Sequence, residues 1–447
     1  MELLDASKKV DSPSKEVDSK ESSSPDQLVT TLMNPIAVRN FCEQVIRYPK
    51  ALQIPYPLER QLFVTQPDSF LWSFYVDKTT RFCAVHEFDT PFQTSLIPMA
   101  QHFPVLQNSL VRLSATHWAK TTGSVSDSSY DELSTALVIK TIQGLRQQLG
   151  EHPLNLDINT AIVCIAACTS LAAAYIGEGR TNLANVHLNG ALNIARNLTQ
   201  NPAFITPSRD AFFVMKWLTY AVTFTNIAKT ACSTNPLEVK ALRSLLEWWT
   251  KVVSLDPEVD HSVDLLFGFN LKLAILILKT VVYAAESTHI LQDLKRLEED
   301  LWKACHTATG PCPVENCHQC DANLIHCNRS FHSSALLFFY TFLGDHSPNS
   351  ELMSKLVSTT ISEIKFIYPD SRYAAAILFS LFIAGSYCEF SDRDFIREYI
   401  ALMKQQCLSN VDLLSVGLER IWKLRDTFNL DIANCHLKIE HLGICLY

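Results

Sequence analysis

The sequence predicts an all-α fold, in which a disordered N-terminal tail precedes a large, irregular helical domain. Apolar residues recur at helical spacing from about residue 35 to the end of the chain. Glycine is scarce, with 12 in 447 residues, against ~7% in an average protein, which disfavours Gly-rich phosphate loops and turn-rich β-sandwiches. The hydrophobic share of 47% provides enough apolar side chains for a large core.

The expected tail covers residues 1–30. Ser, Lys, Asp and Glu dominate this stretch, so it cannot bury enough apolar surface to offset the entropy lost on ordering. Its charges are of both signs, which excludes a basic arm that binds nucleic acid. We expect residues 31–447 to form one helical domain.

The first expected helices cover residues 103–119 and 130–149, because apolar residues recur three and four positions apart in both. Asp157 has the right side chain and position to cap a third, strongly apolar helix that continues to Tyr175. Gly177 follows where a helix-ending glycine is expected.

The remainder of the domain is expected to continue as helices with short breaks between them. The expected ranges are 183–198, 210–229, 263–287, 291–304, 331–342, 351–367, 374–387, 392–407 and 411–427. Pro369 opens a turn within this series. No fixed repeat period is visible, so an irregular domain is favoured over a solenoid.

Charge and hydropathy limit the classes of partner. The chain has 38 Lys and Arg against 46 Asp and Glu, and this acidic balance argues against strong nucleic-acid binding by the chain itself. The apolar runs 161–176 and 265–285 are too short or too charged for a span of about 20 apolar residues, so no membrane association is expected. Cys164 and Cys168 have the spacing of small buried core residues, which favours a reducing, intracellular setting.

We expect that the chain is not an enzyme, because no local catalytic signature is found. The phosphate loop, the nucleophile elbow and the zinc-protease helix are all absent. A dispersed triad among the 14 histidines stays open as the alternative.

A Cys- and His-rich connector is expected at about residues 305–332. Its Cys-x2-Cys spacing can hold one zinc ion, and the candidate ligands are Cys312, Cys317, Cys320 and Cys327. The simpler alternative is a connector without metal, and we therefore expect no cofactor. The next cysteine is Cys388, and only Arg329 adds positive charge, so this segment is not a DNA reader.

The aromatic stretch 212–224 is expected to belong to the core, with an apolar ligand pocket as the alternative. The residues that would line such a pocket are Phe212, Phe213, Trp217, Tyr220, Phe224, Phe267 and Leu271. Its ligand would be a small apolar effector.

Short motifs occur in a fixed order along the chain. They have the forms His-Leu-Asn-Gly-Ala, Val-Asp-Leu-Leu-Phe-Gly-Phe, Phe-Ile-Ala-Gly followed by Asp-Arg, and Trp-Lys-Leu-Arg-Asp. Their characteristic residues are His187, Gly190, Asp264, Gly268, Gly385, Asp392, Arg393, Trp422, Arg425 and Asp426. In this order the motifs resemble the fungal-specific transcription factor domain, the regulatory region that follows a binuclear zinc cluster in many fungal activators. The resemblance covers roughly residues 40–430.

The resemblance implies an α-helical regulatory domain of a nuclear transcription factor, with the cytoplasm as an additional location. Such domains relay effector binding, dimerisation or partner contact to transcription. The family's zinc-cluster cysteines are missing, since the first cysteine is Cys42. DNA contact is therefore expected only indirectly, through another transcription factor or a zinc-cluster partner, unless an upstream cluster precedes this sequence. A homodimer is a further candidate assembly. The alternative is a helical interaction module that retains the fold without a transcriptional role.

Overall fold

The computed structural model describes most of the compact unit Pro55–Tyr447. The described residues are 67–85, 90–123, 128–150, 156–227, 236–255, 263–264, 266–286, 290–307, 322–344, 350–404 and 409–439, with Leu442, Ile444 and Leu446 after them. The tail expected over residues 1–30 lies outside them.

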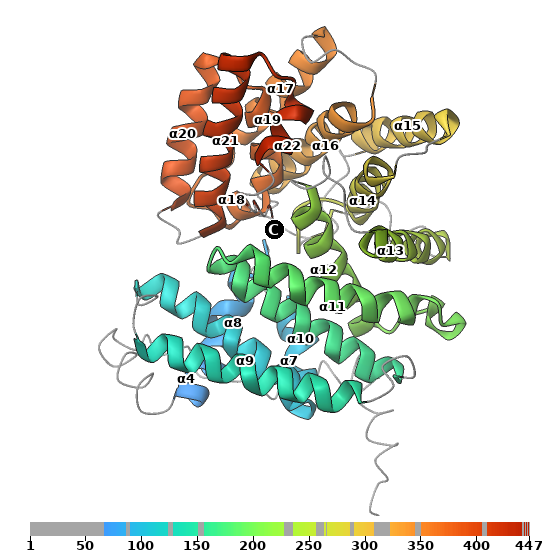
Figure 1. Ribbon diagram of the computed structural model, residues 1–447, viewed down its shortest axis with the longest axis vertical. Coiled ribbons are helices and arrows are strands. Elements are labelled where there is room, and N and C mark those ends of the chain that lie inside the picture. The colour runs from blue at the N-terminus through green and yellow to red at the C-terminus, as the bar shows by residue number, and fades with distance from the viewer. Residues whose placement is uncertain are drawn as a thin grey trace, which may run out of the picture. The chain divides into compact units, whose positions relative to one another are not determined.

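The all-α fold is confirmed (Figure 1). Among the described residues the one β-type pairing joins Val263 to Asn270. The chain begins with α4 (Pro67–Phe74), the π-helix η1 (Tyr75–Thr79), α5 (Thr80–Phe82), α6 (Pro91–Thr94), α7 (Leu96–His102), α8 (Pro104–Thr122) and α9 (Ser128–Leu149). The central elements are α10 (Ile158–Gly177), α11 (Thr181–Thr199), η4 (Pro202–Ile205), α12 (Arg209–Asn226), α13 (Pro236–Leu255) and α14 (Leu271–Ala285).

The C-terminal part is built from eight described helices. These are α15 (Leu291–Thr307), α16 (Ala322–Phe342), α17 (Glu351–Ile364), α18 (Arg372–Ala376), α19 (Leu378–Tyr387), α20 (Phe390–Lys404), α21 (Ser409–Phe428) and α22 (Ile432–Ile439). In Figure 1, α20 and α21 lie side by side, and α19 packs against both. One continuous hydrophobic core extends from Tyr75 to Leu446.

Helix α10 lies within this core and packs against α8, α11 and α12. Within the described part of the chain it alone is long and apolar enough to cross a membrane, and 83% of its most apolar stretch is buried by other elements. The expected N-cap is confirmed, because the Asp157 carboxylate accepts the Thr160 N–H at 3.0 Å.

The C-terminus of α10 differs from the sequence-based expectation. Gly179 has the left-handed φ of 74°, whereas Gly177 is the last helical residue. The Gly179 N–H donates to Ile176 O at 2.9 Å, and the Arg180 N–H donates to Tyr175 O at 2.8 Å. This pair of bonds is a Schellman motif, which satisfies two carbonyls at the helix end.

The starts of two helices differ most from the expected ranges. Helix α14 begins at Leu271 instead of 263, because the Asn270 side chain accepts the Leu273 N–H at 2.8 Å and caps the helix there. Helix α16 begins nine residues before the expected start at 331. Residues 322–332 therefore belong to a helix, and the connector between α15 and α16 is shorter than expected.

Several helices were not expected from the sequence. Helix α13 has buried Leu242, Leu245, Trp249 and Val252 at helical spacing, so the signal was present. The short elements α4–α7 and α22 also lie outside the expected ranges. Short helices carry few periodic positions and are therefore hard to recognise.

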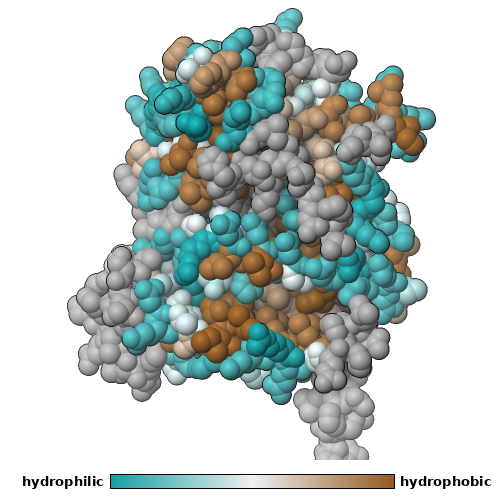
Figure 2. Space-filling model, viewed as in Figure 1, coloured by the Kyte–Doolittle hydropathy of each residue, from teal (hydrophilic) through white to brown (hydrophobic). Residues whose placement is uncertain are grey.

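The face of the molecule in Figure 2 is largely hydrophilic, with apolar side chains gathered in the region of α9 to α11. Exposed apolar residues of these helices are Ile139, Leu183 and Val186.

Candidate functional site

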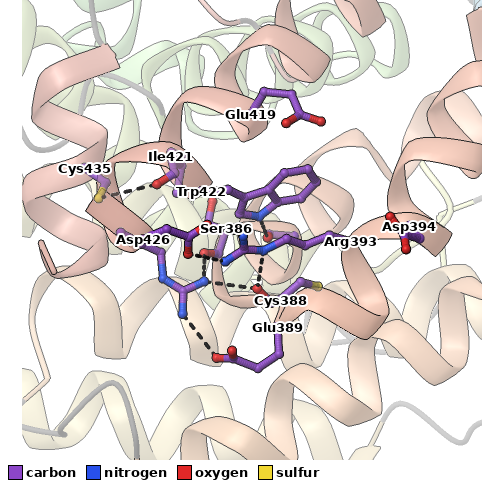
Figure 3. Close-up of polar contacts among 12 residues, drawn as sticks. Ser386, Cys388, Glu389, Arg393, Asp394, Glu419, Ile421, Trp422, Asp426 and Cys435 are labelled. Carbon is purple, nitrogen blue, oxygen red and sulfur yellow. Dashed lines mark hydrogen bonds and ion pairs between the residues drawn. The ribbon is translucent and has the colours of Figure 1, made fainter. Parts of the chain in front are cut away.

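The C-terminal motif residues gather around the end of α19 (Figure 3). The last carbonyls of a helix have no partner within it. Here Trp422 Nε1 donates to Gly385 O at 2.8 Å, and Arg425 Nη1 donates to Ser386 O at 3.0 Å and to Cys388 O at 3.1 Å. Side chains of α21 therefore complete the hydrogen bonding of α19.

Arg393 completes the same cluster from α20. Its two terminal nitrogens donate to the Asp426 carboxylate at 2.6 and 2.9 Å, and its Nε donates to Cys388 O at 3.1 Å. The guanidinium carbon lies 5.4 Å from the centre of the Trp422 ring. Hydrogen bonding from Arg393 lowers the pKa of Asp426. The bidentate geometry is the strong form of this ion pair.

Asp392 does not join this cluster. Its Oδ1 lies 3.8 Å from the ammonium of Lys365, directly after α17, and its side chain is 40% accessible. The Asp-Arg motif thus splits, with the arginine buried and the aspartate on the surface.

Asp264 and Gly268 shape the turn before α14. Asp264 Oδ1 accepts the Leu266 N–H at 2.8 Å, and the carboxylate forms an ion pair with Lys216 of α12. Gly268 has a φ of 81°, and a Cβ at this position would lie 2.7 Å from Cys327 Sγ. Both the backbone conformation and the close approach therefore require glycine.

Cys327 is the one predicted metal ligand among the described residues. It is fully buried on α16, with its sulfur against Gly268, and burial raises its pKa. Metal-binding cysteines are thiolates, so this environment is unfavourable for zinc. The other candidates, Cys312, Cys317 and Cys320, lie outside the described residues, and the zinc site stays a prediction.

His187 and Gly190 occupy α11. The His187 ring stacks on Tyr175 at 5.4 Å between centroids, with the planes 8° apart. Gly190 is exposed, and a Cβ there would have no atom within 4 Å beyond its own helix. The structure thus explains the histidine through stacking and shows no steric need for the glycine.

A buried polar network joins α8, α9 and the turn after α10, and sequence reasoning missed it. Arg112 Nη2 donates to Glu178 Oε1 at 2.5 Å, and Nη1 donates to the Tyr130 hydroxyl at 3.3 Å. Tyr130 also donates to Glu178, and burial raises its pKa to about 12. The signal in the sequence was a single arginine within the apolar face of an amphipathic helix.

A cavity of about 190 Å³ is the main candidate ligand site in the described part of the chain. Its walls come from η1, α5 and residues 83–85, α6, α8, α10, α12, the turn before α14, α18, α19 and α21. Three of the predicted pocket residues, Trp217, Tyr220 and Phe267, line it. Tyr220 and Phe267 stack there with centroids 4.1 Å apart.

The other four predicted pocket residues do not line the cavity. Phe213 stacks on Trp217 behind the wall, at 6.2 Å between centroids. Phe212 contacts the edge of Trp249, and Phe224 packs in a cluster with aromatic rings of α16 and α19. Leu271 is buried at the start of α14.

The polar wall of the cavity was not expected from the sequence. The Nδ1 atom of His117 on α8 lies 3.1 Å from Thr79 Oγ1. The Phe82 ring stacks on the His117 ring, with the centroids 4.3 Å apart. Burial lowers the pKa of His117 to about 4, so the imidazole is neutral at pH 7. Thr79 is the last residue of a π-helix, an element that often marks functional sites.

Comparison of the chain with models of protein families gives the same family as the order of the sequence motifs. The model of the fungal specific transcription factor domain matches residues 69–438. Neither the curated proteins nor the solved structures that were compared gave a match. The matched range contains the motif cluster at the end of α19, the turn before α14 and the cavity. The chain therefore belongs to the fungal specific transcription factor domain family.

Proposed function

We propose that this chain is a fungal transcription regulator that works in the nucleus through its helical domain. The family match over residues 69–438 is the observation that carries the proposal. One core unites elements from Tyr75 to Leu446. Packed cores move between discrete arrangements instead of deforming continuously, which suits a domain that relays a binding event.

DNA contact is proposed to be indirect. The chain has a net charge of −8, which opposes binding to phosphates. The motif arginines Arg393 and Arg425 are engaged with carbonyl oxygens and with Asp426. They are therefore committed to holding helices together. The proposed partner that contacts DNA is another transcription factor or a zinc-cluster protein, and a second copy of the chain is a further candidate partner without that role.

We also propose that the chain is not an enzyme and needs no cofactor. Burial raises the pKa of every cysteine in the described part of the chain. These cysteines are Cys83, Cys164, Cys168, Cys305, Cys327, Cys388 and Cys435. A nucleophilic cysteine has a lowered pKa. Within the described part of the chain, neither ring nitrogen of the buried His332 has a hydrogen-bond partner, whereas a catalytic base is oriented by a third group.

A tethering assay tests the regulatory role. The full chain is fused to a foreign DNA-binding domain, and transcription from a reporter with the matching sites is measured. The expected result is a change in reporter output, lost in Arg393→Met, which disrupts the cluster at α19. Arg420→Gln removes a charge from the exposed side of α21 and should retain the effect. A folded, nuclear fusion without effect on several promoters contradicts the proposal.

The second candidate is an interaction module without a transcriptional role. Exposed Leu183 and Val186, 38% and 65% accessible on α11, favour it because they offer an apolar contact surface. In that case Val186→Asp would weaken binding to a copurifying protein, and the tethered chain would leave the reporter unchanged.

A further inference from the structure

Five serines and threonines of the chain directly precede a proline. They are Ser12, Ser24, Thr90, Thr206 and Ser347. Proline-directed protein kinases phosphorylate such pairs, because proline has no backbone N–H that would stay unpaired in their substrate groove. The cyclin-dependent kinases of this class also prefer Lys or Arg at the third position after the acceptor, where the kinase presents negative charge.

Two of the five pairs have the basic residue at that position. They belong to the segments Ser12-Pro13-Ser14-Lys15 and Thr206-Pro207-Ser208-Arg209. The other three pairs have Gln27, Gln93 and Ser350 there. Among the described residues, Thr206 is therefore the acceptor with the full recognition pattern.

The structure separates the two described threonines of these pairs by their exposure. Thr90 is 3% accessible, and its hydroxyl donates to Thr80 O at 3.5 Å. Thr206 is exposed, and no hydrogen bond with the described residues engages its hydroxyl. Arg209 is exposed as well, and no carboxylate of the described residues pairs with it. A kinase can therefore reach both the acceptor and the basic residue of the second segment.

The backbone around Thr206 is open. Thr206 follows η4 with a φ of −117° and a ψ of 80°, and Ser208 precedes α12 with a φ of −60° and a ψ of 162°. Pro207 between them has a φ fixed near −65° by its ring. Helix α12 begins only at Arg209, the last residue of the motif. The acceptor and the two residues after it thus lie outside regular helix, in the form that a substrate groove accepts.

Two anchors hold this segment at the surface. Before it, the buried Phe204 ring stacks on Trp248 at 5.2 Å between centroids, and Trp248 Nε1 donates to Phe204 O at 2.8 Å. After it, Ser208 Oγ accepts the Ala211 N–H at 3.3 Å and caps α12. Thr206 itself contributes nothing to the core, so a phosphate there changes the surface without displacing buried groups.

We propose that Thr206 is phosphorylated by a proline-directed kinase of the cyclin-dependent class. The kinase transfers the γ-phosphoryl group of ATP to Thr206 Oγ1, the hydroxyl proton passes to the catalytic aspartate of the kinase, and ADP leaves. The phosphate adds a charge of about −1.5 to −2 at pH 7. The modification is a property of this loop, whereas its use as a signal to a partner rests on the proposed function.

Kinase treatment of the full chain tests the site. The Ser12→Ala protein, which lacks the other full motif, is incubated with an active cyclin-dependent kinase and ATP, and mass spectrometry locates the phosphate. Phosphate is expected on Thr206 and not on the buried Thr90. Arg209→Gln should slow incorporation at Thr206 about tenfold, the size expected from losing a hydrogen bond to a charged group. Arg420→Gln, which removes an exposed arginine elsewhere, should leave the rate unchanged.

Three results would overturn the proposal. They are folded protein without phosphate on Thr206, equal rates for Arg209→Gln and its parent, and phosphate on Thr90 at the rate of Thr206.

The tethered reporter addresses the regulatory use of the phosphate in fungal cells. Thr206→Ala should change the reporter output relative to the parent chain. Phosphorylation of Thr206 without such a change refutes the regulatory use alone. A parent chain without any reporter effect refutes the proposed function and leaves the kinase result standing as evidence for the site.

Discussion

Trp422 on α21 donates its indole N–H to the carbonyl oxygen of Gly385 on α19 at 2.8 Å, across 37 residues of sequence. This bond ties two helices together at the end of α19, where the same carbonyl also accepts the Cys388 N–H at 3.2 Å. The contact is buried on both sides, since Trp422 is 2% accessible and Gly385 is buried. It therefore makes a definite contribution to stability.

Trp422→Phe should lower the free energy of unfolding by about 1 kcal/mol, because the buried Gly385 carbonyl would lose one of its two donors and keep the bond from the Cys388 N–H at 3.2 Å. Urea unfolding followed by circular dichroism measures the change. Lys423→Gln, at the next and exposed position, should stay within about 0.5 kcal/mol of the parent. Equal stability of Trp422→Phe and the parent would contradict the assigned role.

Arg393→Met should cost more than Asp426→Asn. The Arg393 side chain is 4% accessible, whereas Asp426 is 38% accessible and partly screened by water. Loss of the arginine also leaves the Cys388 carbonyl without this donor. We expect about 3 kcal/mol for Arg393→Met and about 1 kcal/mol for Asp426→Asn. A urea titration that gives the reverse order would contradict this burial argument.

Acid should reduce the contribution of the Arg393–Asp426 ion pair to the free energy of unfolding. The pKa of Asp426 is lower in the folded chain than its ordinary value of about 3.9. Its contribution is therefore complete above pH about 4 and is lost as the pH falls through the lower folded value. The stability difference between the parent and Asp426→Asn should shrink on acidification below pH 4, as measured by urea unfolding at each pH.

Gly268→Ala and Gly190→Ala form a matched pair. The first should destabilise by more than about 1 kcal/mol, because its φ is 81° and its Cβ would lie 2.7 Å from Cys327 Sγ. The second places alanine on an exposed helix with free space around it, and should be neutral or stabilising by up to about 1 kcal/mol. Thermal unfolding compares the two. Cys327→Ala should restore part of the loss in Gly268→Ala by removing the contact but not the backbone strain.

His436 should make the fold sensitive to mild acid. It is fully buried on α22 near Phe382, and burial lowers its pKa to about 4. In the unfolded chain His436 has the ordinary histidine pKa of about 6.5. On acidification the unfolded chain therefore binds a proton at this residue at a higher pH than the folded chain does. The contribution of the neutral, buried His436 to the free energy of unfolding is fully present above pH 6.5. It decreases as the pH drops toward 4, by up to about 1.4 kcal/mol per pH unit for this group.

The replacement His436→Leu isolates that effect. Urea unfolding at pH 7.5 and pH 5 should show a smaller loss on acidification in the variant than in the parent. Identical pH dependence in the two proteins would show that His436 does not take up a proton on unfolding in this range. The His117 and His332 rings, whose pKa values burial also lowers to about 4, remain in both proteins.

Local patterns predicted the long helices well, because each carries several apolar positions in succession. The N-cap at Asp157 could be predicted for the same reason, since a cap depends only on the next three residues. Helix α13 was missed although Leu242, Leu245 and Trp249 carry the helical spacing. The start of α14 was missed although its cap at Asn270 is equally local, because the apolar residues before it continue the helical pattern.

The cavity was predictable only in part. Trp217 and Tyr220 share one helix with a visible aromatic pattern, and both line it. Thr79, His117 and Arg372 come from separate elements, and no local pattern shows that they meet. The buried Arg112–Glu178 pair joins residues 66 positions apart and was missed for the same reason.

The long separation between Gly385 and Trp422 also bears on how the chain folds during synthesis. When α19 leaves the ribosome, the donors for its terminal carbonyls, Trp422 and Arg425, have not yet been made. The end of α19 must depend on water until α21 follows. A premature stop codon between these positions would thus remove α21 and α22 and leave α19 without the donors at its end. The lost stability would lower the abundance of the truncated chain in the cell.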